Sequence, residues 1–484
     1  MSSTDEKKPL LDAAITINTT ASFSDLNNIQ DELRQVVALA LPVTATFFLE
    51  YAPGIITLLL AGHAVDPNDM QTTTLYLDAA AIAIMYMNVT GVTIGLGLAT
   101  AMDTLCPQAV GGGKSLQTGV YFQAGLVVLG LVFIPIAFAN AWATTILVYF
   151  GQTYTIAVLA REFATIMLVG LPFMFVYELL KKVLQAQNVV LPMMYCAVIG
   201  NCVNAVLGYA LTFHTPLGFY GAAVARSVAN GVLLLSLVTY IFLNKATFQA
   251  CWPGWSLVAA LKEVPKFVAL GISGLLMMLF EWWSFELLVF IAGLQTNATT
   301  AIGANAILVN VTSCIYMIHF GVGTAAQIRV GNALGAGLSH QAQRTVKCAV
   351  ILGVSMGMSF AGALLITRKE FPRCFTHDAD VISLTSYVAI AIAMYQVADA
   401  LNTTLQGVLR GAGLQKTGAL LNFIAYVVVG LPLGTFLDFV VGWGLLGLWV
   451  GMAVGISTSG ICGGLIVHLS DWLVLASDAK NRVS

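Results

Sequence analysis

Long apolar stretches separated by short polar segments recur along the whole chain. A helix needs about 20 such residues to cross a bilayer. The predicted spans are residues 36–62, 78–101, 118–139, 155–182, 190–213, 217–243, 266–293, 301–326, 344–367, 382–408, 417–439 and 444–470. A shorter segment, residues 142–150, predicts a helix at the membrane interface. The pattern therefore predicts an all-α polytopic membrane protein with twelve transmembrane helices.

The two halves of the chain repeat each other. Residues 37–39, 50–51 and 61–62 have counterparts at an offset of 231, in residues 268–270, 281–282 and 292–293. Small residues recur at an offset of 224, namely Gly97, Thr100, Ala101, Ala109, Gly111 and Gly113. A third match, at an offset of 226, begins at Gly208, Gly218 and Gly221. Three matches in the same order indicate a duplication into two parallel six-helix repeats, with the substrate path in the cleft between them.

The distribution of basic residues predicts the orientation. Eleven Lys and Arg residues follow even-numbered spans, whereas only Arg368, Lys369 and Arg373 follow odd-numbered ones. The positive-inside rule then places both termini in the cytoplasm. The expected organisation is a disordered cytoplasmic tail (1–34), an N-terminal six-helix lobe (35–243), a cytoplasmic linker (244–265), a C-terminal six-helix lobe (266–470) and a second cytoplasmic tail (471–484).

Composition agrees with this prediction and excludes other classes of protein. Only 9% of the residues are charged, against roughly 25% in soluble proteins. A net charge of -2 argues against a nucleic-acid partner. The eight cysteines are scattered, without a CxxC pair or a metal-ligand spacing, so we expect neither a disulfide framework nor a metal site.

Four acidic residues fall well inside predicted spans: Glu50, Glu281, Glu286 and Asp399. A charge at bilayer depth costs on the order of 3 kcal/mol or more and marks a functional site by default. No Lys or Arg lies in the same spans, apart from their ends, to neutralise these acids. Burial without a cation favours the protonated form of a carboxyl, which suits a carrier that alternates between a proton and a cationic substrate. The simpler alternative is a protonated carboxyl that only hydrogen-bonds a neighbouring helix.

Aromatic and amide side chains in the same spans are candidates for substrate binding. Rings near the acids could stack on organic cations, or they could simply pack or anchor the helices. Two amides could orient a ligand or bridge helices. The candidates are Tyr51, Trp282, Trp283, Phe285, Tyr395, Asn310 and Gln396.

A glycine-rich segment, residues 111–115 (GGGKS), has a partial likeness to a phosphate-binding loop. The full motif needs a glycine where Gln108 stands and a preceding strand. The repeat places Leu338 where the lysine stands, so the segment is interpreted as a turn between helices. ATP-driven transport is therefore disfavoured. Without a metal cluster or a nucleophile–base pair, we do not expect an enzyme, and His319 is the one histidine expected inside the membrane, near the end of its span.

Several stretches resemble the eukaryotic branch of the multidrug and toxic compound extrusion (MATE) family, over about residues 30–470. The most specific are residues 281–286 (EWWSFE) and 329–337 (RVGNALGAG). Further matches are residues 88–92 (NVTGV), 102–109 (MDTLCPQA) and 407–416 (GVLRGAGLQK).

The resemblance implies a two-lobed, V-shaped fold of twelve helices and export of organic cations, xenobiotics or metabolites against inward proton flow. It assigns proton or cation coupling to Glu281, Glu286 and Asp399. The sequence departs from animal members at Asn310, where they have a glutamate, and at Glu50, where they have a neutral amide. Because Glu50 and Glu281 occupy equivalent repeat positions, each lobe would hold an acid. Asp399 has no acidic counterpart in the first half, which favours coupling in the second.

The leading hypothesis is a proton-coupled exporter of organic cations. One alternative is the same fold carrying organic anions or secondary metabolites, and another is a lipid or oligosaccharide flippase. Anionic cargo is disfavoured because only Arg161 and Arg226 are basic candidates inside the membrane. We expect no cofactor beyond a proton or sodium ion as coupling ion. The expected partners are a small organic cation or metabolite and the lipid bilayer, and we expect a monomer in the plasma membrane or a vacuolar or endolysosomal membrane.

Overall fold

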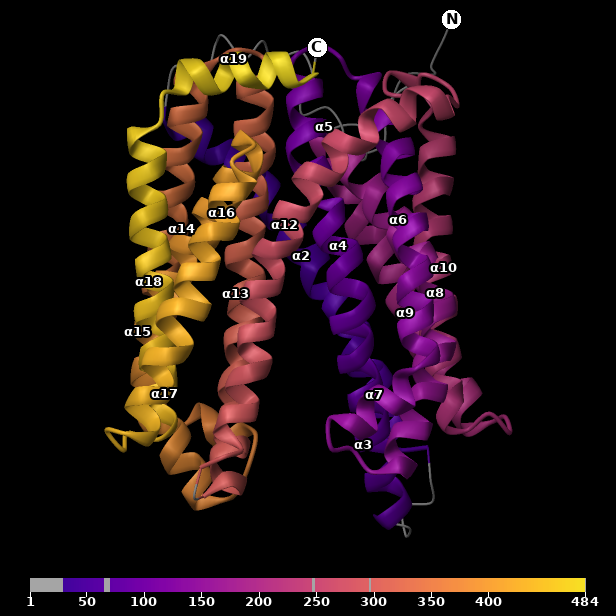
Figure 1. The fold of residues 1–484 in the computed structure, drawn as a ribbon, viewed down its shortest axis with the longest axis vertical. Helices are drawn as coiled ribbons and strands as arrows, with labels where there is room; N and C mark the ends of the chain where they lie inside the picture. The colour runs from indigo at the N-terminus through magenta and orange to yellow at the C-terminus, as the bar shows by residue number, and fades with distance from the viewer. Residues whose placement is uncertain (1–28, 65–69, 246–248, 296, 484) are drawn as a thin grey trace, which may run out of the picture.

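The N-terminal lobe contains six membrane-spanning units. The computed structural model describes residues 29–64, 70–245, 249–295 and 297–483, and Figure 1 shows their arrangement. The second unit is interrupted by a π-helical segment. The elements of this lobe are α2 (Ile29–Gly62), α3 (Met70–Met87), η1 (Asn88–Val92), α4 (Thr93–Ala99), α5 (Ala101–Gly111), α6 (Gln117–Ala141), α7 (Ala143–Tyr149), α8 (Tyr154–Ala186), α9 (Leu191–Phe213) and α10 (Phe219–Leu243).

The C-terminal lobe repeats this plan. Its fifth unit also contains a π-helical segment, and one amphipathic helix follows the last span. The elements are α12 (Leu257–Ala292), α13 (Ala298–Gly335), α14 (Ser339–Thr367), η2 (Phe371–Cys374), α15 (Ala379–Ala412), α16 (Gln415–Asn422), η3 (Phe423–Gly430), α17 (Leu431–Phe439), α18 (Leu445–Leu469) and α19 (Trp472–Val483).

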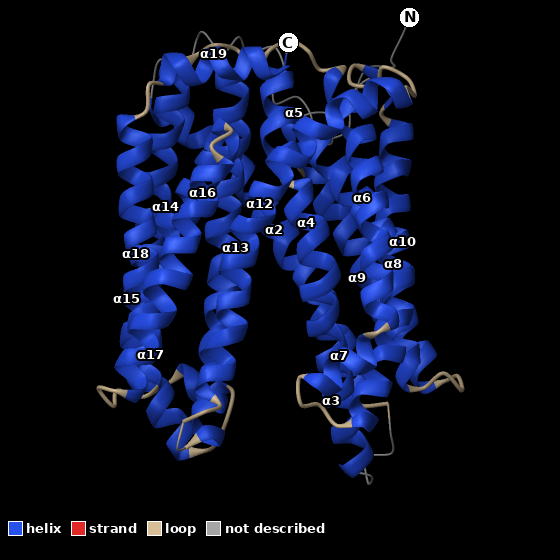
Figure 2. Cartoon of the chain, in the orientation of Figure 1, coloured by secondary structure: helices blue, strands red, loops and turns tan. Residues whose placement is uncertain are grey.

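The observed helices confirm the predicted fold class. Twelve helices are long and apolar enough to cross a membrane, and the described residues form helices and connecting loops without strands (Figure 2). Each predicted span lies within or closely matches one of these helices. The short interfacial helix expected at residues 142–150 is present as α7.

The two lobes form a V (Figure 1). They meet at the end of the molecule where α19 lies, here called the terminal side, and separate toward the opposite end, the far side. Helices α12 and α13 of the second lobe pack against α4, α6, α2 and α5 of the first. Two polar side chains hydrogen-bond across the interface between the lobes, here called the seam. The Thr104 hydroxyl donates to the Arg410 carbonyl at 2.5 Å, and the Gln108 amide donates to the Gly411 carbonyl at 2.9 Å.

Glycines at the seam confirm the pseudo-twofold relation of the repeats. A Cβ atom on Gly111 would lie 1.9 Å from the carbonyl oxygen of Asn332, and one on Gly335 would lie 2.1 Å from that of Gln108. These two contacts are related by the same offset of 224 that relates the sequence repeats. Since real Cβ contacts are never this short, each position requires glycine for the helices to approach.

A second pair of close approaches, nearer the middle of the molecule, obeys the same symmetry. A Cβ atom on Gly97 would lie 2.6 Å from Leu275 Cα, and one on Gly321 would lie 1.9 Å from Thr44 Oγ1. Leu275 and Thr44 are themselves 231 residues apart, which is the offset found for the first span of each repeat. The lobes therefore contact each other through equivalent surfaces.

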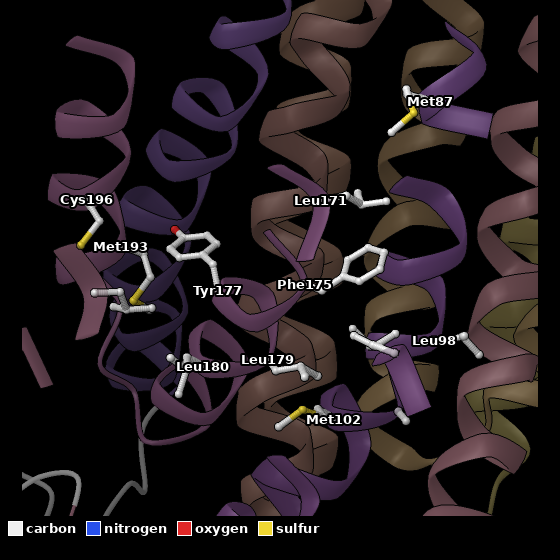
Figure 3. Close-up of a cluster of buried hydrophobic side chains, with 14 of the residues drawn as sticks. Met87, Leu98, Met102, Leu171, Phe175, Tyr177, Leu179, Leu180, Met193 and Cys196 are labelled. Carbon is white, nitrogen blue, oxygen red and sulfur yellow. The ribbon is translucent and has the colours of Figure 1, made fainter. Parts of the chain in front are cut away.

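The N-terminal lobe is held together by a cluster of apolar side chains between α4, α5 and α8. Figure 3 shows Leu98 and Met102 near Phe175 and Leu179. Gly95 leaves the space that the Phe175 ring occupies, because a Cβ atom there would lie 2.0 Å from the ring. In lipid such clusters stabilise the fold by close packing rather than by removal of apolar surface from water.

Both predicted polar segments that flank the second lobe are partly helical. The expected linker, residues 244–265, ends early because α12 begins at Leu257, with the Ser256 hydroxyl accepting from the amide of Ala259 at 3.3 Å. The expected tail, residues 471–484, contains α19, whose buried side chains, Trp472, Ala476, Ala479 and Val483, form one helical stripe. The first tail, expected over residues 1–34, gives way to α2 at Ile29, and residues 1–28 lie outside the described residues.

Candidate functional site

A buried Asp–His pair lies inside the C-terminal lobe. Asp399 on α15 and His319 on α13 are both 0% exposed, and His319 Nδ1 lies 3.0 Å from the Asp399 carboxylate. The Thr403 hydroxyl, one turn further along α15, donates to the other carboxylate oxygen at 3.4 Å. The Tyr395 side chain, one turn before, lies close to the Asp399 carboxylate. The spacing of four residues places all three α15 side chains on one helix face.

Glu281 on α12 faces the same interior. Its carboxyl lies close enough to Asp399 and to the Tyr316 side chain of α13 to interact with both electrostatically. Arg410 is the one basic group that acts on Glu281 through charge, and no Lys, Arg or His among the described residues lies within salt-bridge distance of this carboxyl. Glu281 is therefore an acid at membrane depth without an ion-pair partner.

Four aromatic side chains surround the far-side end of this acidic group. Phe285 on α12 lies 6.3 Å from Tyr395, 6.5 Å from Tyr426 and 6.3 Å from Trp449, measured between ring centroids. Tyr395 and Trp449 meet edge to face at 5.5 Å. The Trp449 indole N–H donates to Asn305 at 3.0 Å. Tyr395, Tyr426 and Trp449 are at most 1% exposed, so these three rings belong to the packed core of the lobe.

Several buried polar atoms around this site have no partner among the described residues. They are both amide atoms of Gln396, the Tyr426 hydroxyl and His319 Nε2. Buried polar groups in native proteins nearly always find a protein, water or ligand partner. The inner surface of the C-terminal lobe thus has unused hydrogen-bonding capacity for water or for the polar groups of a substrate.

The acid of the N-terminal lobe is in a different environment. Glu50 makes an ion pair with Lys181, whose ammonium group lies 2.9 Å from one carboxylate oxygen and also contacts Glu178 at 2.6 Å. The Tyr177 hydroxyl donates to Glu50 at 2.9 Å. The expectation that Glu50 has no cation to neutralise it is therefore wrong. The cation comes from another span, because α8 continues to Ala186 and carries Lys181 into the interior of the lobe.

Comparison with known proteins fits this geometry. The MatE family profile matches twice, at residues 42–210 and 275–436, once in each lobe. The chain belongs to the MatE family. It is 35% identical over 446 residues to the human protein named multidrug and toxin extrusion protein 1, covering 92% of this chain and 76% of that protein. It is 32% identical over 466 residues to DETOXIFICATION 16 of Arabidopsis thaliana, covering 95% and 93%.

Solved structures of MATE transporters have the same architecture. The eukaryotic MATE transporter AtDTX14 superimposes with a TM-score of 0.87 at 30% identity, covering 94% of this chain and 100% of that one. A MATE transporter of Vibrio cholerae superimposes with a TM-score of 0.82 at 16% identity, covering 92% and 99%, which supports the fold alone. These matches confirm the resemblance to the eukaryotic branch, and the protein is a multi-pass MATE transporter.

The MATE structure brings together some of the predicted site residues and separates others. Glu281, Asp399, Phe285, Tyr395 and Gln396 lie in or around the C-terminal interior. Trp282 is half-buried. The remaining candidates of the second lobe, Glu286, Trp283 and Asn310, are exposed, and the Asn310 amide donates to the carbonyl of Ala306 in its own helix. Glu281 and Glu286 thus differ in burial, as their angular separation of about 140° on a helix predicts. In the first lobe, Tyr51 is 38% exposed.

Side chains outside the predicted set complete the site. Tyr316, Tyr426 and Trp449 line the C-terminal interior, and His319 contacts Asp399 directly. His319 was expected near the end of its span. Helix α13 extends nine residues beyond the predicted span, to Gly335, so the histidine lies well inside the helix. One usable signal was present: Tyr316 and His319 are three residues apart and occupy one helix face.

Buried ion pairs lie at the terminal side of this MATE protein, and one of them joins the two lobes. Arg329 on α13 makes a two-pronged ion pair with Glu32 on α2, with both N–O distances 2.7 Å, and the Thr345 hydroxyl adds a third bond at 2.6 Å. Within the first lobe, Lys182 contacts Asp103 at 2.5 Å. The Glu32–Arg329 pair joins the two lobes, so the terminal side cannot open without breaking it.

Proposed function

We propose that this MATE transporter exports organic cations in exchange for protons. The observation that carries the proposal is the contrast between the two equivalent acids. Glu50 is neutralised by Lys181, whereas Glu281 has no ion-pair partner and lies beside aromatic rings. A carboxyl in such a site can hold either a proton or a cation, and the two occupants exclude each other. Mutual exclusion is the thermodynamic basis of exchange.

The proposed cycle uses both sides of the V. In the conformation described here the lobes are apart on the far side and closed on the terminal side (Figure 1). The positive-inside rule supports a cytoplasmic location for the terminal side, so the far side would face the outside or an organelle lumen. A proton arriving from the far side would displace the bound cation from Glu281. The proton would leave when the terminal side opens.

The names of the relatives support the class of cargo. The human and rabbit relatives are named multidrug and toxin extrusion proteins. The site of this chain suits such cargo because its acids attract positive charge and the half-buried Phe285 ring can contact a flat apolar surface. We propose a monomer in the plasma membrane or an endolysosomal or vacuolar membrane, with a proton rather than a sodium ion as the coupling ion.

The test is transport in reconstituted vesicles. An acidic vesicle interior should drive uptake of ethidium, a fluorescent cation with a fixed charge, and an imposed sodium gradient of the same size should not. The Glu281→Gln variant should lose the pH-driven uptake because its amide cannot carry a proton. Glu370→Gln, which changes an acid that is exposed and paired with Arg373, is the matched control and should transport normally. Uptake driven equally by sodium, or retained in Glu281→Gln, would contradict the proposal.

One observation favours an anionic cargo as the second candidate. Arg226 on α10 has a buried guanidinium nitrogen, Nη1, without a hydrogen-bond partner among the described residues. An unpaired buried guanidinium is costly and attracts an anion. Competition of ethidium uptake by citrate and by a non-fluorescent organic cation separates the two candidates. Inhibition by citrate that Arg226→Met abolishes would favour the second.

A further inference from the structure

The C-terminal helix α19 runs along the terminal side of the second lobe toward the first (Figure 1). Three of its buried side chains, Trp472, Ala476 and Ala479, belong to an apolar cluster of the C-terminal lobe. The fourth, Val483, belongs to the cluster formed mainly by the N-terminal lobe. The helix packs on α13 and α14 of one lobe and on α5 of the other. It therefore bridges the seam, with its last residues on the first lobe.

The start of α19 is fixed to the last membrane span. The Asp471 carboxylate accepts from the amide of Leu473 at 2.9 Å and from that of Val474 at 3.3 Å. Such a cap satisfies amide groups that the first turn of a helix leaves unpaired. The Trp472 indole N–H also donates to the carbonyl of Val467 in α18 at 3.3 Å. These bonds hold the first turn of α19 to the C-terminal lobe.

The end of α19 contacts the first lobe through Arg482 and Val483. Arg482 Nη1 donates to the side-chain oxygen of Gln108 on α5 at 2.7 Å, and the Gln108 amide donates to the Gly411 carbonyl of α15 at 2.9 Å. A Cβ atom on Gly112, which follows α5, would lie 3.5 Å from Val483 Cγ2. Gln108 is 0% exposed. One buried glutamine of the first lobe thus bonds both α19 and α15 of the second.

Two basic side chains of α19 lie at the ends of helices of the second lobe. Lys480 lies against Gly337 and Arg482 lies against Gly413, the glycines with positive φ that follow α13 and end α15. The carbonyl ends of helices attract positive charge. Lys266 Nζ on α12 also donates to the backbone carbonyl of Arg482 at 2.7 Å. Helix α19 is therefore anchored to the second lobe at both of its ends, and it should move with that lobe.

We propose that α19 is a latch, a segment that stays on the C-terminal lobe and must release α5 before the terminal side can open. Opening separates Gln108 from Arg482 and Gly112 from Val483, because each pair joins the two lobes. The latch acts on the change of conformation itself, so it depends neither on the cargo nor on the coupling ion. It goes beyond the proposed function and can be tested without a transport assay.

Loss of the Arg482 side-chain bond should raise the open fraction. Arg482→Met keeps an aliphatic side chain and removes the charged donor to Gln108, so the terminal side should open about tenfold more often. Lys480→Met is the matched control, because it removes a cation of the same helix that lies against the second lobe. The readout is the rate at which a soluble maleimide labels Thr104→Cys, a position that is 0% exposed at the seam. Peptide mass spectrometry assigns the label to residue 104.

A disulfide between α19 and α5 gives the opposite perturbation. Gly112→Cys and Val483→Cys, combined in the Thr104→Cys background, place two thiols within bonding reach, since Cβ atoms of a disulfide lie about 3.8 Å apart. Oxidation should make labelling at residue 104 slower than in the background protein, and reduction should restore the rate. Each single cysteine variant, treated with the same oxidant, controls for the native cysteines.

The outcomes distinguish the latch from the proposed function. Equal labelling rates in Arg482→Met and Lys480→Met would overturn the latch, because the contact between the lobes would then not hold the terminal side closed. An unchanged rate after disulfide formation would also overturn it, because α19 would not need to release α5. Both measurements report conformation, so either result leaves pH-driven transport of ethidium intact. Wild-type protein without pH-driven transport would refute the proposed function and leave the latch standing.

Discussion

Breaking the ion pair between Glu32 and Arg329 should open the terminal side. Glu32 is 1% exposed and Arg329 is 6% exposed, and their two bonds of 2.7 Å join α2 of one lobe to α13 of the other. Glu32→Gln leaves the arginine buried without a counter-charge. Removing one partner of a buried pair costs about 3–5 kcal/mol. This cost applies to the closed terminal side, because opening exposes Arg329 to water.

The expected shift in conformation is therefore large. Each 1.4 kcal/mol changes an equilibrium about tenfold, so a loss of about 3 kcal/mol raises the open fraction about a hundredfold. Glu32, but not Arg329, has a counterpart of the same kind in the repeat. Glu263, 231 residues after Glu32, is bonded by the Gln117 amide at 3.3 Å. It also pairs with Lys266 at 3.0 Å on a more exposed surface. Glu263→Gln should cost at most about 1 kcal/mol and serves as the matched control.

Thiol labelling at the seam measures the open fraction. Thr104 is 0% exposed and bonds across the lobes to the Arg410 carbonyl. A Thr104→Cys background should react with a soluble maleimide only when the terminal side opens, and peptide mass spectrometry separates this site from the native cysteines. Glu32→Gln should accelerate labelling far more than the Glu263 control. The double variant Glu32→Gln/Arg329→Met should restore slow labelling, because it leaves no buried unpaired charge.

Two results would refute this reasoning. Equal labelling rates in Glu32→Gln and Glu263→Gln would show that the buried pair does not hold the lobes together. Fast labelling in the double variant would show that lost packing, rather than an unpaired charge, opens the seam. Melting temperature and elution volume are measured in parallel, because general unfolding would also expose residue 104. Fast labelling with an unchanged melting temperature supports local opening of the seam.

The remaining predictions concern the first lobe and the seam. Lys181→Met leaves Glu50 without its cation and should destabilise the fold by about 3–5 kcal/mol, which a lower melting temperature would show. The protein that remains folded should still couple ethidium transport to the pH gradient. Loss of coupling at an unchanged melting temperature would contradict the assignment of the proton to the second lobe. Gly111→Ala and Gly335→Ala place a Cβ atom 1.9 Å and 2.1 Å from a carbonyl oxygen, so both should accelerate labelling at the seam to a similar extent. Gly130→Ala is the control and should label slowly, because a Cβ atom there would meet no other atom within 4 Å. Slow labelling in Gly111→Ala or in Gly335→Ala would count against the symmetric contact.

Much of the fold could be predicted from the sequence. The spans follow from runs of apolar residues, and the repeat predicts the two-lobed arrangement. The exact ends of the helices could not be predicted, because Arg329 interrupts the apolar pattern yet lies inside α13, neutralised by Glu32 from another helix. The same applies to Lys181, one of the eleven basic residues that the sequence analysis counts after even-numbered spans, which lies buried beside Glu50.

The site was predicted in part for a related reason. Residues 281–286 and Asp399 could be selected because acids are rare inside apolar spans. The contact of Asp399 with His319 joins residues 80 positions apart on two helices, and it depends on how each helix is rotated. Rotation is set by packing with neighbours rather than by local pattern. Sequence reasoning therefore found the charges and missed the partners that decide their roles.

The glycine contacts at the seam form a short hinge about which the two lobes can rotate as rigid bodies. Gly111 and Gly335 bring helix backbones together at one end of the molecule. Helix α13, with 38 residues, extends from there about 57 Å at 1.5 Å per residue. A rotation of about 10° at the seam would move its other end by about 10 Å over that length. Because backbone atoms form this hinge, substitutions of side chains deep in each lobe can change the cargo preference without altering how the lobes rotate.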